Sequence, residues 1–93
     1  MYKNVIHQKE QQRFVINKGG LTAYMSYEFV ADSVLDYNHT IVPPDLGGQG
    51  IGTVLVQFAL AYARVNHLSV VPSCSFVAHY ISKHDGEQDL LVK

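Results

Sequence analysis

The sequence predicts an α+β fold, with a mixed, mostly antiparallel sheet and the element order β-β-β-β-α-β-α. Two observations lead to this order. The first half of the chain alternates apolar and polar residues with the period of two typical of strands, and the second half changes to the helical period of 3.6. Ninety-three residues, 47% of them hydrophobic, suffice for one small domain, which we expect to span residues 1–93.

Four strands are expected before the first helix. Residues 5–16 are predicted to form two short strands around a polar turn at 8–12, and residues 17–20 carry the turn chemistry of a hairpin. Residues 21–30 alternate strictly, and residues 34–42 are rich in β-branched and aromatic side chains. Strict alternation would place four side chains of this last strand on a common face: Leu35, Tyr37, His39 and Ile41.

The second half predicts a strand-loop-helix-strand crossover. Pro43 and Pro44 end the fourth strand, because proline donates no ladder hydrogen bond. Residues 51–65 are predicted to form an amphipathic helix, and residues 68–72 a short buried strand. A second helix is expected to start at the cap Ser73 and to end at Lys83, followed by a C-terminal tail. The first helix would bury the stripe Ile51, Val54, Leu55, Phe58, Ala59 and Tyr62.

Charge and composition limit the partners. Seven basic and eight acidic residues give a net charge of −1 with no basic run, so we expect no nucleic-acid partner. The most apolar stretch, residues 51–63, is shorter than the ~20 residues of a membrane span. The sequence lacks an apolar signal-peptide region and has one cysteine, so we expect a cytoplasmic chain, as a monomer or weak homodimer. The histidines lack metal-ligand spacing, and no metal is expected.

The glycine-rich segment at residues 47–52 is the strongest functional signal. It joins a strand to a helix, where unpaired N–H groups and the helix dipole favour a phosphate. The alternative is a tight turn without a ligand. A Walker A loop is excluded because the segment contains no lysine. A dinucleotide fingerprint is excluded because its last glycine would fall on Thr53 or Leu55.

The segment Gly47-Gly48-Gln49-Gly50-Ile51-Gly52 resembles the Gln/Arg-x-x-Gly-x-Gly/Ala signature of the GCN5-related N-acetyltransferases (GNAT), which bind the pyrophosphate of acetyl-CoA. The sequence is more similar still to the minimal single-domain subfamily of these proteins, labelled YjdJ-like or NATD1-like. Its further motifs occur here in order: Arg13-Phe14, His39-Thr40-Ile41-Val42, Pro72-Ser73-Cys74-Ser75-Phe76 and Tyr80-Ile81-Ser82-Lys83-His84. The resemblance spans about residues 5–92. One position departs, because Gly47 stands where the family has Gln or Arg.

The resemblance implies a GNAT-like fold and an acetyl-CoA-dependent N-acetyltransferase, in which an unidentified amine of a small molecule or protein attacks directly. The alternative is a non-catalytic acyl-CoA-binding module or partner-regulated subunit, because the chain lacks the extra elements that wall the acceptor pocket. Acetyl-CoA would be held by the main chain of Ile41 and Val42, by the loop and helix start Gly47, Gly48, Gln49, Gly50, Ile51, Gly52 and Thr53, and by Lys83 and His84.

Three residues are candidates for catalysis. Cys74, near the start of the second helix, is either an acyl acceptor or a neighbour of the thioester, or else a buried structural cysteine. His39 is a candidate general base, or else a residue packed between Tyr37 and Ile41. The resemblance makes Tyr80 the acid that protonates the CoA thiolate, the alternative being a core aromatic.

The C-terminal cations of the second helix also have two interpretations. Lys83 and His84 would meet the phosphates of CoA, or else stabilise the helix C-terminus.

Overall fold

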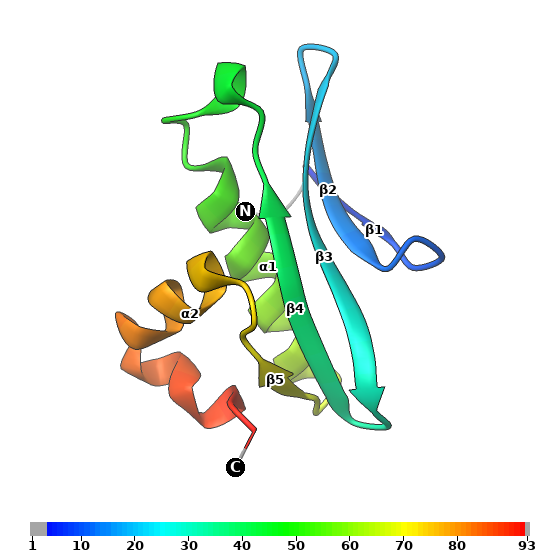
Figure 1. Cartoon of the computed structure of the whole chain (residues 1–93), viewed down its shortest axis with the longest axis vertical. Helices are drawn as coiled ribbons and strands as arrows, with labels where there is room; N and C mark the ends of the chain where they lie inside the picture. The colour runs from blue at the N-terminus through cyan, green and yellow to red at the C-terminus, as the bar shows by residue number, and fades with distance from the viewer. Residues whose placement is uncertain (1–3, 93) are drawn as a thin grey trace.

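A computed structural model describes residues 4–92. Its single sheet has the strand order β1-β2-β3-β4-β5, and the first four strands form an antiparallel meander. The fifth strand runs parallel to β4 after a helical crossover (Figure 1). This confirms the predicted fold class and element order. The strands are β1 (Val5–Gln8), β2 (Arg13–Lys18), β3 (Leu21–Ala31), β4 (Val34–Ile41) and β5 (Ser69–Val71).

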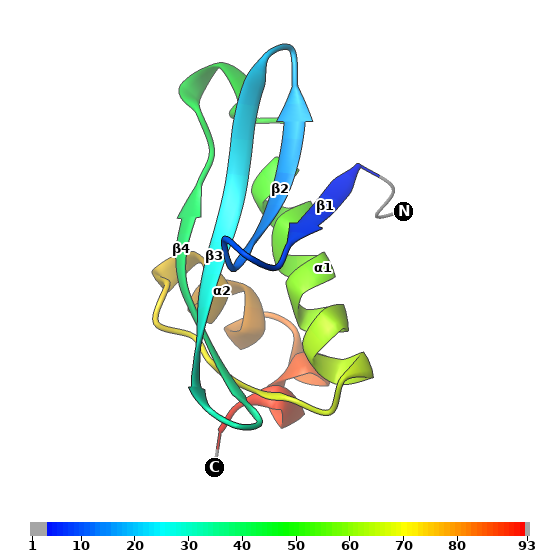
Figure 2. The same ribbon diagram turned by 90° about the vertical axis from the view of Figure 1, so that its right-hand side faces the viewer.

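The helices all contribute to one hydrophobic core on one face of the sheet (Figure 2). Helix α1 (Ile51–Val65) packs on β2 to β5, and α2 (Ser75–Ser82) inserts two buried side chains into the same core. Two short 3₁₀ helices, η1 (Pro44–Leu46) and η2 (Asp85–Leu90), flank them. Within residues 4–92, no helix is long and apolar enough to cross a membrane.

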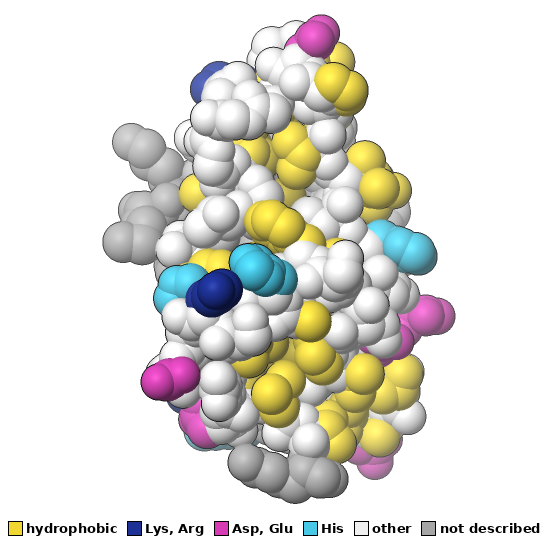
Figure 3. Space-filling model, turned by 60° about the vertical axis from the view of Figure 1, so that its left-hand side comes forward, with side chains coloured by type: hydrophobic (Ala, Val, Ile, Leu, Met, Phe, Trp, Pro, Cys, Tyr) yellow, Lys and Arg dark blue, Asp and Glu magenta, His cyan; other side chains and the backbone are white. Residues whose placement is uncertain are grey.

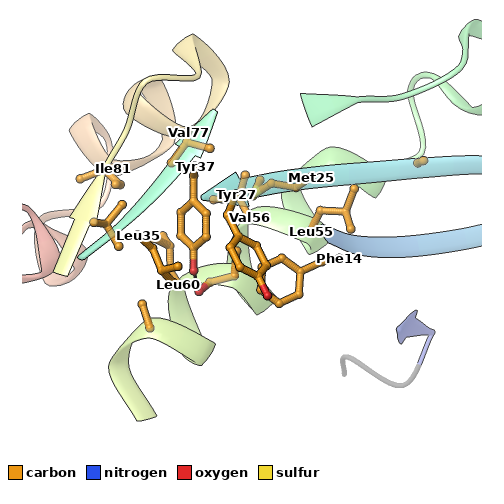
Figure 4. Packing of buried hydrophobic residues seen from close by; sticks show 14 of the residues in the cluster. Phe14, Met25, Tyr27, Leu35, Tyr37, Leu55, Val56, Leu60, Val77 and Ile81 are labelled. Carbon is orange, nitrogen blue, oxygen red and sulfur yellow. Dashed lines mark hydrogen bonds between the residues drawn. The ribbon is translucent and has the colours of Figure 1, made fainter. Parts of the chain in front are cut away.

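The core lies where α1 and α2 meet the central strands β3 and β4 (Figure 4). The largest completely buried side chain belongs to Tyr37, whose hydroxyl donates a 2.6 Å hydrogen bond to the carbonyl of Ala59. This bond ties β4 to the middle of α1. The other core residues labelled in Figure 4 are Phe14, Met25, Tyr27, Leu35, Leu55, Val56, Leu60, Val77 and Ile81.

A β-bulge interrupts β4 at Asn38. Tyr37 pairs with Tyr27, but the next pair along the two strands joins His39 to Ser26, so Asn38 is an extra residue. An extra residue reverses the side-chain alternation beyond it. The predicted common face is therefore wrong: Leu35 and Tyr37 are buried, whereas His39 and Ile41 are exposed on the opposite face. Thr40, paired with the buried Met25, takes the helix-facing position instead.

Several boundaries differ from the sequence prediction. Cys74 rather than Ser73 is the N-cap of α2, because its backbone N–H donates to the Tyr37 carbonyl at 2.9 Å before the helix begins. The C-terminal residues form η2 rather than an extended tail. Helix α1 has the predicted bounds, but it is also packed against α2 and η2. Its buried side therefore includes four positions outside the predicted stripe, Gly52, Val56, Leu60 and Ala63. Three residues of the predicted stripe are only partly buried: Val54, Phe58 and Tyr62.

Candidate functional site

A groove of about 400 Å³ lies between the end of β4, the glycine loop and the first turns of α1 and α2. Figure 3 views the face that carries the glycine loop and α2, and it shows apolar side chains exposed between them. None of the groove's lining residues within 4–92 carries a charged side chain. Its lining residues are Thr40, Val42, Leu46, Gly47, Gly48, Gly50, Ile51, Gly52, Thr53 and Phe76.

The start of α1 offers backbone N–H groups to this groove. Gly50 is the N-cap, its φ of 75° lies in the left-handed region, and no side chain of residues 4–92 caps the helix. The first turn also contains no acidic residue, and the first helical bond runs from the N–H of Val54 to the carbonyl of Gly50 at 3.1 Å. The preceding N–H groups and the helix dipole therefore favour an anion at this end of the groove.

The loop glycines have different physical roles. Gly48 and Gly50 adopt positive φ values of 77° and 75°, and a Cβ added at either would meet no atom within 4 Å. At Gly52, by contrast, a Cβ would lie 3.0 Å from Cζ of Phe76. Gly52 therefore lets α2 approach α1 closely, whereas Gly48 and Gly50 shape an open loop.

The groove is bounded by a strand edge that β5 leaves open. Strand β5 pairs with β4 only along the segment 34–36. Beyond the bond from Cys74 to the Tyr37 carbonyl, β4 continues to Ile41 with no strand on that side among residues 4–92. Val42 lines the groove, and Ile41 directs its side chain to the opposite face. The predicted cofactor-binding role of their main chain stays a prediction.

Cys74 lies beside the groove, in contact with β4. Its Sγ is 3.3 Å from Oγ1 of Thr40, and the side chain is half-buried. Although partial burial raises the pKa of this thiol, hydrogen bonds from the Thr40 hydroxyl and from backbone N–H groups bring the pKa below its ordinary value. Those N–H groups belong to Val77, Phe76 and Thr40. These hydrogen bonds favour the thiolate form of Cys74, which lies beside the groove at the start of α2.

The other predicted site residues do not join Cys74. His39 lies on the outer face of the sheet, and Tyr80 stacks on the His84 ring with centroids 3.9 Å apart. His84 Nδ1 is also 2.7 Å from the Tyr80 carbonyl, and Lys83 is the C-cap of α2. None of these side chains lines the groove. Their proposed roles stay predictions. No group of three His, Cys, Asp or Glu within residues 4–92 could hold a metal ion.

Two contacts, one in the groove and one at the glycine loop beside it, were not predicted from the sequence. Phe76 of α2 packs over Gly52. The only sequence feature that pointed to Phe76 was its place in the motif of residues 72–76. Lys18, from the hairpin between β2 and β3, donates a 2.5 Å hydrogen bond from Nζ to Oε1 of Gln49 in the glycine loop. Thirty-one residues separate these two partners, so no local pattern connects them.

A mostly antiparallel sheet with one splayed parallel pair, and a glycine loop leading into the crossover helix, defines an acetyltransferase-type α+β fold. The sequence profile of the GCN5-related N-acetyl-transferases matches residues 13–90, and the chain belongs to this family.

Known relatives agree with this assignment. Protein NATD1 of Gallus gallus and of Mus musculus are each 27% identical over 88 residues, covering 92% of this chain and 80% of the relative. A GCN5-like protein from Staphylococcus aureus, solved by NMR, superposes with a TM-score of 0.74 at 33% identity. That match covers 96% of this chain and 89% of the other.

Proposed function

We propose that the chain is an acetyl-CoA-dependent N-acetyltransferase that binds acetyl-CoA in the groove and transfers the acetyl group to an amine. One observation carries the proposal: the uncapped start of α1 and the open edge of β4 border the same groove. Membership of the GCN5-related family supports it. We also propose that residues 1–93 act as one domain in the cytoplasm.

The two parts of the groove suit the two parts of this ligand. N–H groups at the start of α1 would bind the pyrophosphate, and Gly48 and Gly50 leave space above the loop because neither carries a Cβ. The end of β4, where β5 no longer pairs, would offer the main chain of Ile41 and Val42 to the amides of the pantetheine arm, as a neighbouring strand would. The thioester would then lie near the contact between Thr40 and Cys74.

Bound acetyl-CoA supplies a thioester, whose acetyl carbon bonds to the amine nitrogen while the C–S bond breaks and the CoA thiolate leaves. The chain would orient the carbonyl with backbone N–H groups that stabilise the developing oxyanion. His39, exposed on the outer face next to the bulge, would take the amine proton directly or through water. Tyr80 stays the predicted proton donor to the thiolate.

Calorimetric titration with acetyl-CoA tests the binding step. We expect saturable 1:1 binding to the wild type and none to Gly50→Val, because the added side chain strains the left-handed backbone and enters the space over the loop. Gly86→Val in η2 adds the same side chain away from the groove and should bind normally. Melting temperatures check that both variants fold. Normal binding by a folded Gly50→Val protein would refute the phosphate-loop assignment.

A non-catalytic acyl-CoA-binding module is the second candidate, favoured by one observation: His39 and Tyr80 do not meet Cys74 in the groove. It predicts acetyl-CoA binding without turnover. Steady CoA release with any amine of a broad panel would eliminate it. Intact-mass spectra after incubation with acetyl-CoA test the remaining route, because acylation of Cys74 would add an acetyl mass that Cys74→Ser prevents.

A further inference from the structure

Lys18 contacts the glycine loop that borders the groove, although it belongs to the N-terminal hairpin. It is the last residue of β2 and pairs with Leu21 across a two-residue turn, Gly19–Gly20, whose φ values are 59° and 78°. Such a turn fixes the end of the strand. By alternation, Lys18 shares a face with Phe14 and Ile16, whose side chains are buried under the helices. Its ammonium therefore projects on the same side of the sheet as the glycine loop, where it contacts Gln49.

The other cations of residues 4–92 are engaged or remote from this loop. Arg64 forms ion pairs with two carboxylates of η2, at 3.0 and 2.9 Å. Arg13 donates to Gln8 and lies over the ring of Tyr24. Lys9 follows β1 at the opposite end of β2, and Lys83 is the C-cap of α2. Lys18 forms no ion pair within the described part of the chain, and its partner at the loop is a neutral amide.

We propose that Lys18 is a phosphate-binding residue of the acetyl-CoA groove. Among residues 4–92, no positive side chain lines the groove, and Gly47 stands where the family motif carries Gln or Arg. The ammonium of Lys18 supplies this missing charge from a neighbouring element, since its flexible stem lets it exchange the Gln49 amide for a phosphate oxygen. The assignment rests on the proposed function. The phosphate is either the pyrophosphate or the 3′-phosphate of CoA.

The test uses the full-length chain and calorimetric titrations with CoA and with 3′-dephospho-CoA. Lys18→Gln removes the charge, and Lys18→Arg keeps it. Lys9→Gln is the matched control, because Lys9 is also exposed but lies in the turn between β1 and β2, at the other end of β2. We expect Lys18→Gln to weaken CoA binding about tenfold, with Lys18→Arg and Lys9→Gln within about twofold of the wild type. If Lys18 contacts the pyrophosphate, Lys18→Gln should weaken the binding of dephospho-CoA by the same factor as that of CoA. If Lys18 contacts the 3′-phosphate, dephospho-CoA binding is insensitive to Lys18→Gln.

Each contrary result has a distinct meaning. Equal CoA affinity of folded Lys18→Gln and Lys9→Gln overturns the assignment of Lys18 and leaves the proposed function standing. Equal weakening by Lys18→Gln and Lys18→Arg also overturns it, because the hairpin would then act through its shape rather than its charge. A wild type that binds no CoA refutes the proposed function itself, and with it the role of Lys18.

Discussion

Replacing Tyr37 by Phe removes the hydroxyl that ties β4 to α1 and leaves the ring in place. The hydroxyl is completely buried and donates to the Ala59 carbonyl at 2.6 Å. Ala59 lies inside α1, so its carbonyl keeps an intrahelical bond and is not left unsatisfied. The loss is therefore the net value of one hydrogen bond, about 1 kcal/mol of unfolding free energy. For a domain of this size that corresponds to a fall of roughly 4–8 °C in Tm.

Alkaline pH supplies a second signature for the same variant. Burial raises the pKa of Tyr37, with smaller contributions from nearby Tyr62 and Tyr27. A tyrosine whose folded pKa is raised stabilises the fold below its unfolded pKa of about 10, and this stability is lost as the pH rises further. Between pH 9 and 11 the unfolding free energy of the wild type should therefore fall more steeply than that of Tyr37→Phe. The difference in slope should be on the order of that for one proton released on unfolding.

Urea unfolding followed by circular dichroism measures both effects, with Tyr24→Phe on the outer face as the control. At pH 7 we expect the control to stay within about 0.5 kcal/mol of the wild type. The reasoning is refuted if Tyr37→Phe matches the control at pH 7 and shows the wild-type slope above pH 10. A loss beyond about 3 kcal/mol would also refute it, because a single net hydrogen bond cannot account for that much.

Three further predictions concern titration and surface charge. Burial and the charge of Lys9 lower the pKa of His7. Wild-type stability should therefore fall as the pH drops below about 6.5, because the unfolded chain takes up a proton there that the folded chain resists. His7→Gln should reduce this loss, measured as the difference between urea midpoints at pH 7.5 and 5.5. Thr40→Val removes a hydrogen bond that favours the Cys74 thiolate, so alkylation by iodoacetamide at pH 7, followed by intact mass, should slow severalfold. Arg64→Ala breaks exposed ion pairs and should cost less than about 1 kcal/mol in urea unfolding, with the difference shrinking in high salt.

Hydrophobic periodicity accounts for the parts of the fold that the sequence predicted well. The alternation along β3 holds over nine residues, 21–29, and the helical period of α1 over a longer segment, so each element type was unambiguous. The start of α2 was misplaced because it depends on a tertiary bond, from the Cys74 N–H to the Tyr37 carbonyl. Local propensity favours Ser73 over Cys74 as an N-cap, so it predicts the wrong position.

The candidate site was predictable where a local motif encoded it. The glycine loop and the position of Cys74 at the start of α2 follow from short segments. The contact of Lys18 with Gln49 depends on how the hairpin lies over the loop, and the face of His39 depends on a bulge. Neither feature leaves a signature in a single sequence, because both arise from pairing between distant segments.

The bulge at Asn38 determines how β4 serves the proposed reaction. In a regular strand that continued from Tyr37, alternation would direct His39 and Ile41 toward the helices and Thr40 away from Cys74. The extra residue reverses this arrangement, so Thr40 meets the cysteine on the groove side while His39 faces the side of the sheet that carries no helix among residues 4–92. For the proposed transfer, the thioester would therefore have to reach the open edge of β4, where the acetyl carbon can be attacked by an amine that approaches from the side of His39.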